Sequence, residues 1–195
     1  MLDTIYLVRH GETVWNAAGR FQGARDSALT DRGRQQAAAV GRVLAATLGT
    51  GAPLVAHVSP RGRTRETATI LGQHVALDVR DEPRLAEVSL GCWEGLTEYE
   101  IEAEYPGARA GTTAFDWYFR SPDGERLEAA RERVAAWLAE VRGPVLAVSH
   151  GLVGRIVRGV FLGLSDEAML ELPIPQHTVY ALVDGPVRKI RELPG

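Results

Sequence analysis

Short runs of apolar and β-branched residues, each bounded by turn residues or a change of pattern, predict six strands. They cover Thr4 to Val8, Leu54 to Val58, Val75 to Val79, Val145 to Val148, Thr178 to Val183 and Val187 to Ile190. The last two would be joined by a turn at Asp184 and Gly185. Apolar residues at helical spacing predict helices over Thr30 to Leu48, with Thr30 as N-cap, and over Arg61 to Leu71, Thr97 to Glu104, Arg126 to Val141 and Leu152 to Leu162.

Strands that alternate with helices are typical of the α/β class, so we expect a three-layer α/β/α sandwich with a mostly parallel central sheet. A chain of 195 residues fits a single domain. From Arg80 to Glu125 the periodicity weakens, and aromatic residues concentrate in FDWYF, Phe115 to Phe119. We interpret this region as a lid-like insertion. The alternative is a hydrophobic cluster that packs under a long loop.

The composition is that of an ordinary globular protein, with 45% hydrophobic and 24% charged residues and a net charge of -3. No basic arm or Lys/Arg stripe is present, which argues against a nucleic-acid partner. Cys92 is the only cysteine, so an intrachain disulfide and a CxxC site are excluded. The chain shows no signal-peptide pattern and no apolar run of membrane length, so we expect a cytoplasmic protein with no membrane partner.

Two predicted strands end in a histidine followed by a glycine. One run delivers Arg9 and His10 to its end, and the run from Val145 delivers His150 and Gly151. Ligands of open α/β sheets bind beyond the carboxyl ends of the strands. Neighbouring parallel strands would therefore bring the two histidines to one site.

A third strand is followed by a helix whose first turns carry Arg61, Arg63 and Arg65. Cations are unfavourable at a helix N-terminus unless an anion is bound nearby, so this cluster predicts a phosphate. The guanidinium groups of Arg9 and Arg63 would bind a phosphoryl group bidentately.

A neutral imidazole is a competent nucleophile, and neighbouring arginines favour the neutral form. We therefore expect His10 to attack phosphorus and form a covalent intermediate. A protonated His150 would join the arginines in stabilising the transferred group. The reaction also needs a proton donor, which we assign to Glu87, in a loop with Trp93 and glycines that would shield it from water. Glu12 and Glu94 are rival carboxylates.

The chain resembles the histidine phosphatase superfamily, the phosphoglycerate mutase-like proteins, over nearly its whole length. The matching segments are RHGET at Arg9 to Thr13, LTDRGRQQA at Leu29 to Ala37, SPRGRTRETA at Ser59 to Ala68, LAEVSLGCWEG at Leu85 to Gly95, and VSHG at Val148 to Gly151. The resemblance implies that His10 is the phosphorylated histidine and that Arg63 is the second arginine. It places the acid and base at Glu87 and the second histidine at His150.

The same resemblance implies further ligand contacts. Asn16 and either Thr13 or Gly151 would add donors around the phosphate, and Gln22 and Gly23 would line the substrate side. Two positions depart from the family pattern. Arg61 replaces a residue that is usually apolar, and we interpret it as a solvated first-turn arginine rather than an anion contact. Arg126 replaces a residue that is often serine, which removes any contact made through that serine.

The leading hypothesis is a phosphomonoester hydrolase that acts on a small phosphorylated metabolite and passes the phosphoryl group from His10 to water. The alternatives are a phosphoglycerate mutase and a noncatalytic phospho-ligand binding module. No HxH or HExxH pattern occurs, so we expect metal-independent chemistry without a cofactor. The aromatic segment would either cover the leaving group or serve as core. The sequence is compatible with a monomer or a homodimer and does not identify the substrate.

Overall fold

A computed structural model describes residues 4–49, 51–113, 116–183 and 187–190. Within these residues the chain forms one six-stranded sheet, in the order β3-β2-β4-β1-β5-β6. The strands are β1 (Ile5–Arg9), β2 (Leu54–Val58), β3 (Leu77–Asp81), β4 (Val145–Ser149), β5 (Val179–Leu182) and β6 (Val187–Ile190). The first four in the spatial order are parallel, whereas β5 runs antiparallel to β1, and β6 runs antiparallel to β5. The mostly parallel sheet confirms the predicted fold class.

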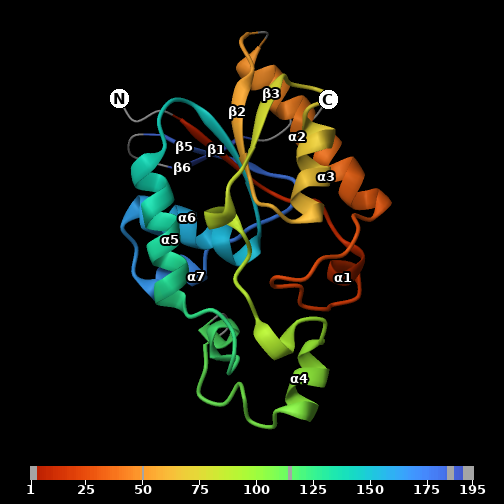
Figure 1. The fold of residues 1–195 in the computed structure, drawn as a ribbon, viewed down its shortest axis with the longest axis vertical. Coiled ribbons are helices and arrows are strands. Elements are labelled where there is room, and N and C mark those ends of the chain that lie inside the picture. The colour runs from red at the N-terminus through yellow and green to blue at the C-terminus, as the bar shows by residue number, and fades with distance from the viewer. Residues whose placement is uncertain (1–3, 50, 114–115, 184–186, 191–195) are drawn as a thin grey trace.

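Helices cover both faces of this sheet, as Figure 1 shows. The helices are α1 (Val14–Ala17), α2 (Asp31–Leu48), α3 (Gly62–Leu71), α4 (Glu98–Glu104), α5 (Leu127–Glu140), α6 (Gly151–Leu162) and α7 (Asp166–Leu170). Helices α2 and α3 pack on one face in a core that includes Val8 and Val148. Helices α5 and α6 pack on the other face, in a core that includes Leu7 and Ala147. Successive strand residues point to opposite faces, so both layers draw on the same strands.

Burial on both faces explains why the sequence of β4 reads as an unbroken apolar run, since all five of its residues are buried. The local signals of the helices are equally direct. Thr30 accepts a hydrogen bond from the N–H of Gly33 at 3.0 Å and caps α2, as predicted.

The structure differs from the prediction at β3, which begins at Leu77 rather than Val75. The N–H of Val75 instead bonds the carbonyl of Leu71 and continues the turn that ends α3. Edge strand β3 is largely exposed and carries Asp78 and Arg80, so its apolar pattern is weak. The prediction therefore placed the start of the strand two residues too early, at Val75. The predicted turn at 184–185 lies outside the described residues.

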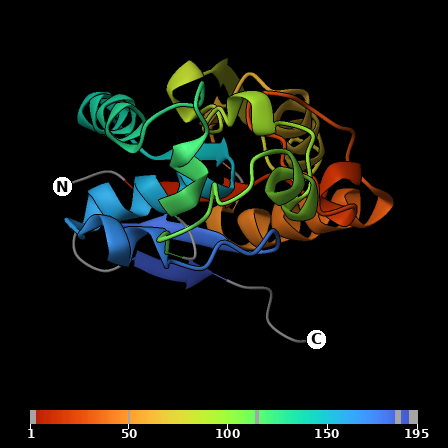
Figure 2. The same cartoon turned by 90° about the horizontal axis from the view of Figure 1, so that it is seen from below.

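Between β3 and α5 the chain forms α4 and three short 3₁₀ helices, η1 (Pro83–Leu85), η2 (Gly91–Trp93) and η3 (Asp116–Arg120). Buried side chains of this segment, Trp93 and Trp117 among them, belong to the same core as α5 and α6. The segment lies beyond the carboxyl ends of the strands, at the bottom of Figure 1 and in front in Figure 2. A lid movement of this segment and a single-domain organisation stay predictions. In the described part of the chain, no helix combines the length and apolar character needed to cross a membrane.

Candidate active site

The two predicted histidines meet where β1 and β4 end. These strands pair in parallel with Arg9 opposite Ser149, and the N–H of His10 donates to the Ser149 carbonyl at 3.0 Å. The next residue of each chain segment is therefore a histidine at the same edge of the sheet. The rings of His10 and His150 lie edge to face, with centroids 5.2 Å apart.

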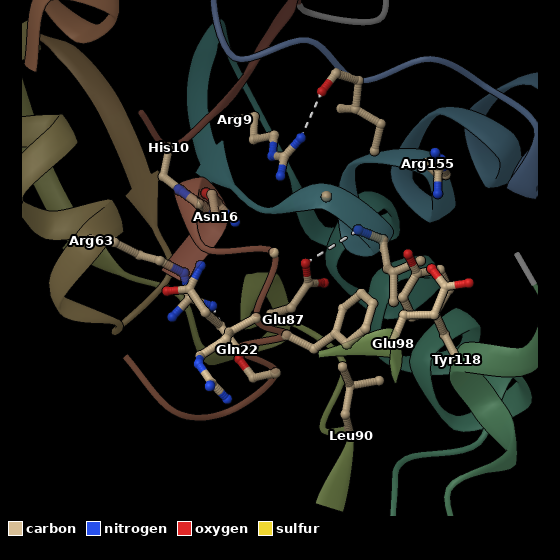
Figure 3. A pocket seen from close by; sticks show the side chains of 17 residues that line it. Arg9, His10, Asn16, Gln22, Arg63, Glu87, Leu90, Glu98, Tyr118 and Arg155 are labelled. Carbon is tan, nitrogen blue, oxygen red and sulfur yellow. Dashed lines mark hydrogen bonds between the residues drawn. The ribbon is translucent and has the colours of Figure 1, made fainter. Parts of the chain in front are cut away.

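A cavity of about 450 Å³ opens beside His10. Figure 3 shows Arg9, His10, Asn16 and Arg63 at one end, which we term the phosphoryl end. Arg155, Tyr118 and Glu98 lie at the opposite end, which we term the far end, and Glu87 lies between the two. Eight predicted site residues line this cavity: Arg9, His10, Asn16, Gln22, Gly23, Arg63, Glu87 and Gly151. His150 and Thr13 are not part of the lining.

The ring of His10 is held as a neutral imidazole with one nitrogen bare. Its Nδ1 lies 2.8 Å from the carbonyl oxygen of Gly11. A carbonyl can only accept, so Nδ1 carries the proton and Nε2 keeps its lone pair. Burial lowers the pKa of His10 well below its usual value, and the positive charges of Arg9 and Arg63 lower it further. The imidazole is thus in the form that a nucleophile requires.

The loop after β1 is fixed by close backbone packing. A Cβ at Gly11 would lie 2.2 Å from the carbonyl oxygen of Gly33 in α2, so only glycine allows this approach. The N–H of Gly11 also donates to Thr67 Oγ1 at 3.2 Å. Helices α2 and α3 therefore both hold the segment that orients His10.

His150 is buried, is not part of the cavity lining, and is neutral in this arrangement, whereas the sequence predicted a protonated form. Arg63 Nε donates to His150 Nδ1 at 3.2 Å, so the proton is on Nε2, which donates to Ser59 Oγ at 2.7 Å. Burial lowers the pKa of His150 well below its usual value, and Arg63 adds to this effect. His150 therefore positions Arg63.

Arg63 is only 1% exposed and uses most of its donors within the protein. Besides His150, Nη1 donates to the carbonyl of Arg25 at 2.6 Å and to Asp26 Oδ1 at 3.0 Å, and Nη2 donates to the carbonyl of Gly23 at 3.0 Å. Four of the five guanidinium N–H groups are occupied. The bidentate grip predicted for Arg63 is not available in this arrangement, because a single N–H, on Nη2, is left for a ligand.

Arg9, unlike Arg63, keeps one edge of its guanidinium, with the Nε and Nη2 N–H groups, open for a ligand. Its Nη1 donates to the carbonyl of Ile174 at 3.0 Å. Its Nε is buried and has no hydrogen-bond partner among the residues that the structure describes. Burial lowers the pKa of Arg9, while the nearby Glu87 opposes that shift. An unsatisfied buried donor on a cation, at the phosphoryl end of a cavity, fits an oxyanion ligand.

Glu87 is fixed at the N-terminus of α6. Its carboxyl oxygens accept hydrogen bonds from the N–H groups of Leu152 and Val153 at 3.2 Å each, and of Val88 at 3.1 Å. His150, the N-cap residue of α6, makes no capping hydrogen bond with its side chain. The Glu87 carboxylate caps the free N–H groups at the start of the helix instead. The side chain lies in the cavity between the phosphoryl end and the far end (Figure 3).

The rival carboxylates have structural partners and do not line the cavity. Glu94 is 8% exposed and accepts from the N–H groups of Ala24 and Leu90 at 2.7 and 3.0 Å. Glu12 accepts from Thr30 Oγ1 at 2.9 Å, at the start of α2. Of the three carboxylates, Glu87 alone lines the cavity.

Thr13 was predicted as a phosphate donor, but the structure uses it as a helix cap. Its Oγ1 accepts from the N–H of Asn16 at 3.1 Å, and Asn16 Oδ1 accepts from the N–H of Thr13 at 3.3 Å. Thr13 is fully buried and is not part of the cavity lining. Asn16 Oδ1 also accepts from Gln176 Nε2 at 3.0 Å, which leaves the Asn16 amide NH₂ for a ligand.

Gly151 and Gln22 both line the cavity. A Cβ at Gly151 would lie 3.5 Å from Glu87 Oε2 and 3.7 Å from Arg9 Cζ, so glycine keeps the space between these groups open. Gln22 is 6% exposed, and its Oε1 accepts from Ser27 Oγ at 3.1 Å, which directs its NH₂ group away from that bond.

The two departures from the family pattern lie outside the cavity. Arg61 is the half-buried N-cap of α3. Arg126 donates to the carbonyls of Phe119 at 2.7 Å and Ser121 at 3.2 Å, so it holds the chain that enters α5. Among the described residues of the aromatic segment, Trp117 and Phe119 are buried in the core, and Tyr118 lines the cavity.

Arg155 lines the cavity and Gln176 contacts Asn16, but neither residue was predicted from the sequence. Arg155 lies one helical turn after Gly151 on α6, so i, i+4 spacing was a usable signal. Gln176 belongs to a segment without any periodic pattern. Across the described part of the chain, no group of three or more His, Cys, Asp or Glu side chains is arranged to hold a metal ion.

The family model described as "Histidine phosphatase superfamily (branch 1)" matches residues 5–188. The "Probable phosphoglycerate mutase GpmB" of Salmonella arizonae is 38% identical over 167 residues, which cover 82% of this chain and 75% of that protein. The glucosyl-3-phosphoglycerate phosphatase of Mycobacterium tuberculosis is 36% identical over 182 residues, with 87% and 76% covered.

A solved structure, the alpha-ribazole phosphatase from Shigella flexneri, superposes with a TM-score of 0.78 at 28% identity and covers 91% of this chain and 89% of that one. The family match spans almost the whole chain, and the relatives carry names of phosphatases and mutases. The chain therefore belongs to the histidine phosphatase superfamily, branch 1.

Proposed function

We propose that the protein is a metal-independent phosphomonoester hydrolase that acts on a small phosphorylated metabolite through a phosphohistidine at His10. The observation that carries this proposal is the pairing of a bare His10 Nε2 with the open donor edge of Arg9 at the same end of one cavity. The relatives named as phosphatases support it.

In the first step the His10 Nε2 lone pair attacks phosphorus, a bond from nitrogen to phosphorus forms, and the ester bond breaks. Glu87 gives its proton to the leaving oxygen. In the second step Glu87 takes a proton from water, the water oxygen attacks phosphorus, and inorganic phosphate leaves as His10 regains its lone pair. One residue thus acts as acid and then as base.

Charge on the transferred group is stabilised mainly by Arg9. Its Nε and Nη2 N–H groups share one edge of the guanidinium and can bind two oxygens side by side. Arg63 adds the remaining Nη2 N–H, and Asn16 adds its amide NH₂. Because these donors are already held by the Ile174, Gly23 and Gln176 contacts, little reorganisation is needed when the ester binds.

The test is the release of phosphate from an aryl phosphate by the wild type and by His10→Ala, with and without a metal chelator. We expect the wild type to release phosphate equally well in both conditions and His10→Ala to be inactive. His74→Ala is the matched control, since His74 is exposed and outside the cavity. Equal rates for His10→Ala and the wild type would overturn the assignment of the nucleophile.

Phosphoglycerate mutase activity is the second candidate, because relatives near 38% identity carry that name. A mutase returns the phosphoryl group from the histidine to a bound hydroxy acid instead of water. Incubation with 3-phosphoglycerate and a bisphosphate primer separates the two activities. Release of inorganic phosphate supports the hydrolase, and conversion to 2-phosphoglycerate supports the mutase.

A further inference from the structure

Two contacts that hold the phosphoryl end come from the loop between α7 and β5, whose residues 172–176 we term the strap. The Ile174 carbonyl accepts from Arg9 Nη1 at 3.0 Å (Figure 3). Gln176 Nε2 donates to Asn16 Oδ1 at 3.0 Å. The first contact leaves Nε and Nη2 of Arg9 for the phosphoryl group, and the second leaves the NH₂ group of Asn16. A displacement of the strap would therefore move both sets of donors.

The strap has no internal structure that could fix its position. Its residues lie outside the helices and strands that the structure describes, and no backbone hydrogen bond joins two of them. Pro173 and Pro175 carry no N–H, and each disfavours a helical conformation of the residue before it. The carbonyls of an extended segment of this kind are open to donors from elsewhere. The position of the strap therefore depends on side chains of the surrounding elements.

Two side chains outside the cavity lining hold the Pro173 carbonyl. It accepts from Arg158 Nη2 at 2.6 Å and from Tyr180 Oη at 2.9 Å, so both of its lone pairs are used. The Arg158 guanidinium lies over the Tyr180 ring, 4.1 Å from its centroid, which fixes the two donors relative to each other. At the preceding residue, Arg155 Nε donates to the Leu172 carbonyl at 2.8 Å. Helix α6 and strand β5 thus anchor the strap to the core.

Arg158 is a costly residue to bury for packing alone. It is 3% exposed, and no carboxylate is among its hydrogen-bond partners in the described part of the chain. Besides the bond to Pro173, its Nε makes a longer bond, 3.3 Å, to the carbonyl of Gly154 on the same helix. An apolar side chain of similar volume would fill this space without the desolvation of a cation. What an apolar side chain could not supply is the hydrogen bond to the strap.

We propose that Arg158 and Tyr180 are positioning residues for the binding of the phosphoryl group. By holding the Pro173 carbonyl they fix the strap, and the strap in turn directs Arg9 and Asn16. The connection is short, because residues 173 and 174 are adjacent and the carbonyl of the second bonds Arg9 directly. This inference rests on the proposed hydrolase function, in which those two side chains bind the transferred group.

The experiment measures kcat/KM on an aryl phosphate, the dissociation constant of orthovanadate by calorimetry, and the melting temperature. The dissociation constant does not depend on the fraction of folded protein, so a residue that only stabilises the fold leaves it unchanged. Arg158→Met keeps the packing volume without a donor, Arg158→Lys keeps one donor and the charge, and Tyr180→Phe keeps the ring. The matched control is Arg131→Met, whose exposed arginine pairs with Asp166 on the surface.

We expect Arg158→Met to lower both kcat/KM and the affinity for orthovanadate about tenfold, since small displacements of positioning groups have effects of this size or larger. Tyr180→Phe should lose a smaller factor in both measurements. Arg158→Lys should stay within about threefold of the wild type, because a single donor reaches the Pro173 carbonyl. Arg131→Met should match the wild type.

A double-mutant cycle tests the route of the effect. In an Arg9→Lys background, Arg158→Met should cost less than in the wild type, because the donor edge that the strap directs is already absent. The same tenfold loss in both backgrounds would overturn the positioning role, and so would an unchanged dissociation constant in both Arg158→Met and Tyr180→Phe. If the wild type bound orthovanadate but released no phosphate from the ester, the proposed function would be contradicted, and the titrations would still decide the positioning role.

Discussion

Replacing Arg63 by lysine keeps the charge but removes the planar fork. In the structure Arg63 is 1% exposed and donates four hydrogen bonds, to His150, Arg25, Asp26 and Gly23. A lysine ammonium has three donors at one point, so it cannot occupy the positions of Nε and of both terminal nitrogens. We expect the bond to His150 and at least one other to be lost.

A hydrogen bond to a charged group contributes about 1.5–3 kcal/mol, so two lost bonds correspond to about 3–6 kcal/mol of unfolding free energy. That is a large part of the about 5–15 kcal/mol that stabilises a typical domain. Arg63→Lys should therefore be strongly destabilised as well as slow. Arg9→Lys should behave differently, because Arg9 has a single described bond to the protein through its side chain, to the Ile174 carbonyl.

The assay is urea unfolding followed by fluorescence, together with kcat/KM on an aryl phosphate. Arg61→Lys is the matched control, since Arg61 lies two residues away and its Nε has no hydrogen-bond partner among the described residues. We expect Arg61→Lys to unfold like the wild type and Arg9→Lys to lose activity with little loss of stability. An unfolding free energy of Arg63→Lys within about 1 kcal/mol of the wild type would refute this reasoning, because that is less than one such bond contributes.

Three further predictions follow from the site. Glu87→Gln should slow alkyl esters at least tenfold more than aryl esters, since a good leaving group needs less protonation; equal losses would remove Glu87 from the acid role. Gly151→Ala should lower kcat/KM about tenfold or more while its melting curve stays that of the wild type. The added methyl group would lie 3.5 Å from Glu87 and 3.7 Å from Arg9, in the space proposed for the ester. Undiminished activity would contradict the placement of the ester there. His10 and His150 have folded pKa values well below those of the unfolded chain, so the unfolded state binds more protons and stability falls as the pH decreases below about 6.5, by up to about 1.4 kcal/mol per pH unit for each histidine. His10→Gln should flatten this slope in urea titrations from pH 7 to pH 5, and an unchanged slope would show that His10 is not held neutral.

Much of the fold could be predicted because its signals are local. The apolar run of β4 and the Thr30 cap of α2 each follow from a few adjacent residues. The proximity of His10 and His150 could be predicted because the carboxyl ends of neighbouring parallel strands lie at the same edge of the sheet. Edge strand β3 was misplaced by two residues because its exposed faces remove the apolar pattern.

The finer arrangement of the site depends on partners that carry no sequence signal. The carbonyls of Gly23 and Arg25 occupy the donors of Arg63, and the carbonyl of Ile174 orients Arg9. A carbonyl is present at every residue, so residue types cannot indicate which one will accept. The neutral state of His150 has the same origin, since it follows from the direction of one hydrogen bond.

In the proposed mechanism, His10 carries the phosphoryl group during turnover. The most direct measurement is rapid quenching of the enzyme with an ester labelled in its phosphate, followed by mass spectrometry of the peptide that contains His10. We expect an acid-labile, base-stable phosphoryl group on His10 that forms within a single turnover and is absent in His10→Ala. Turnover without any such adduct, or an adduct on His150 instead, would contradict it.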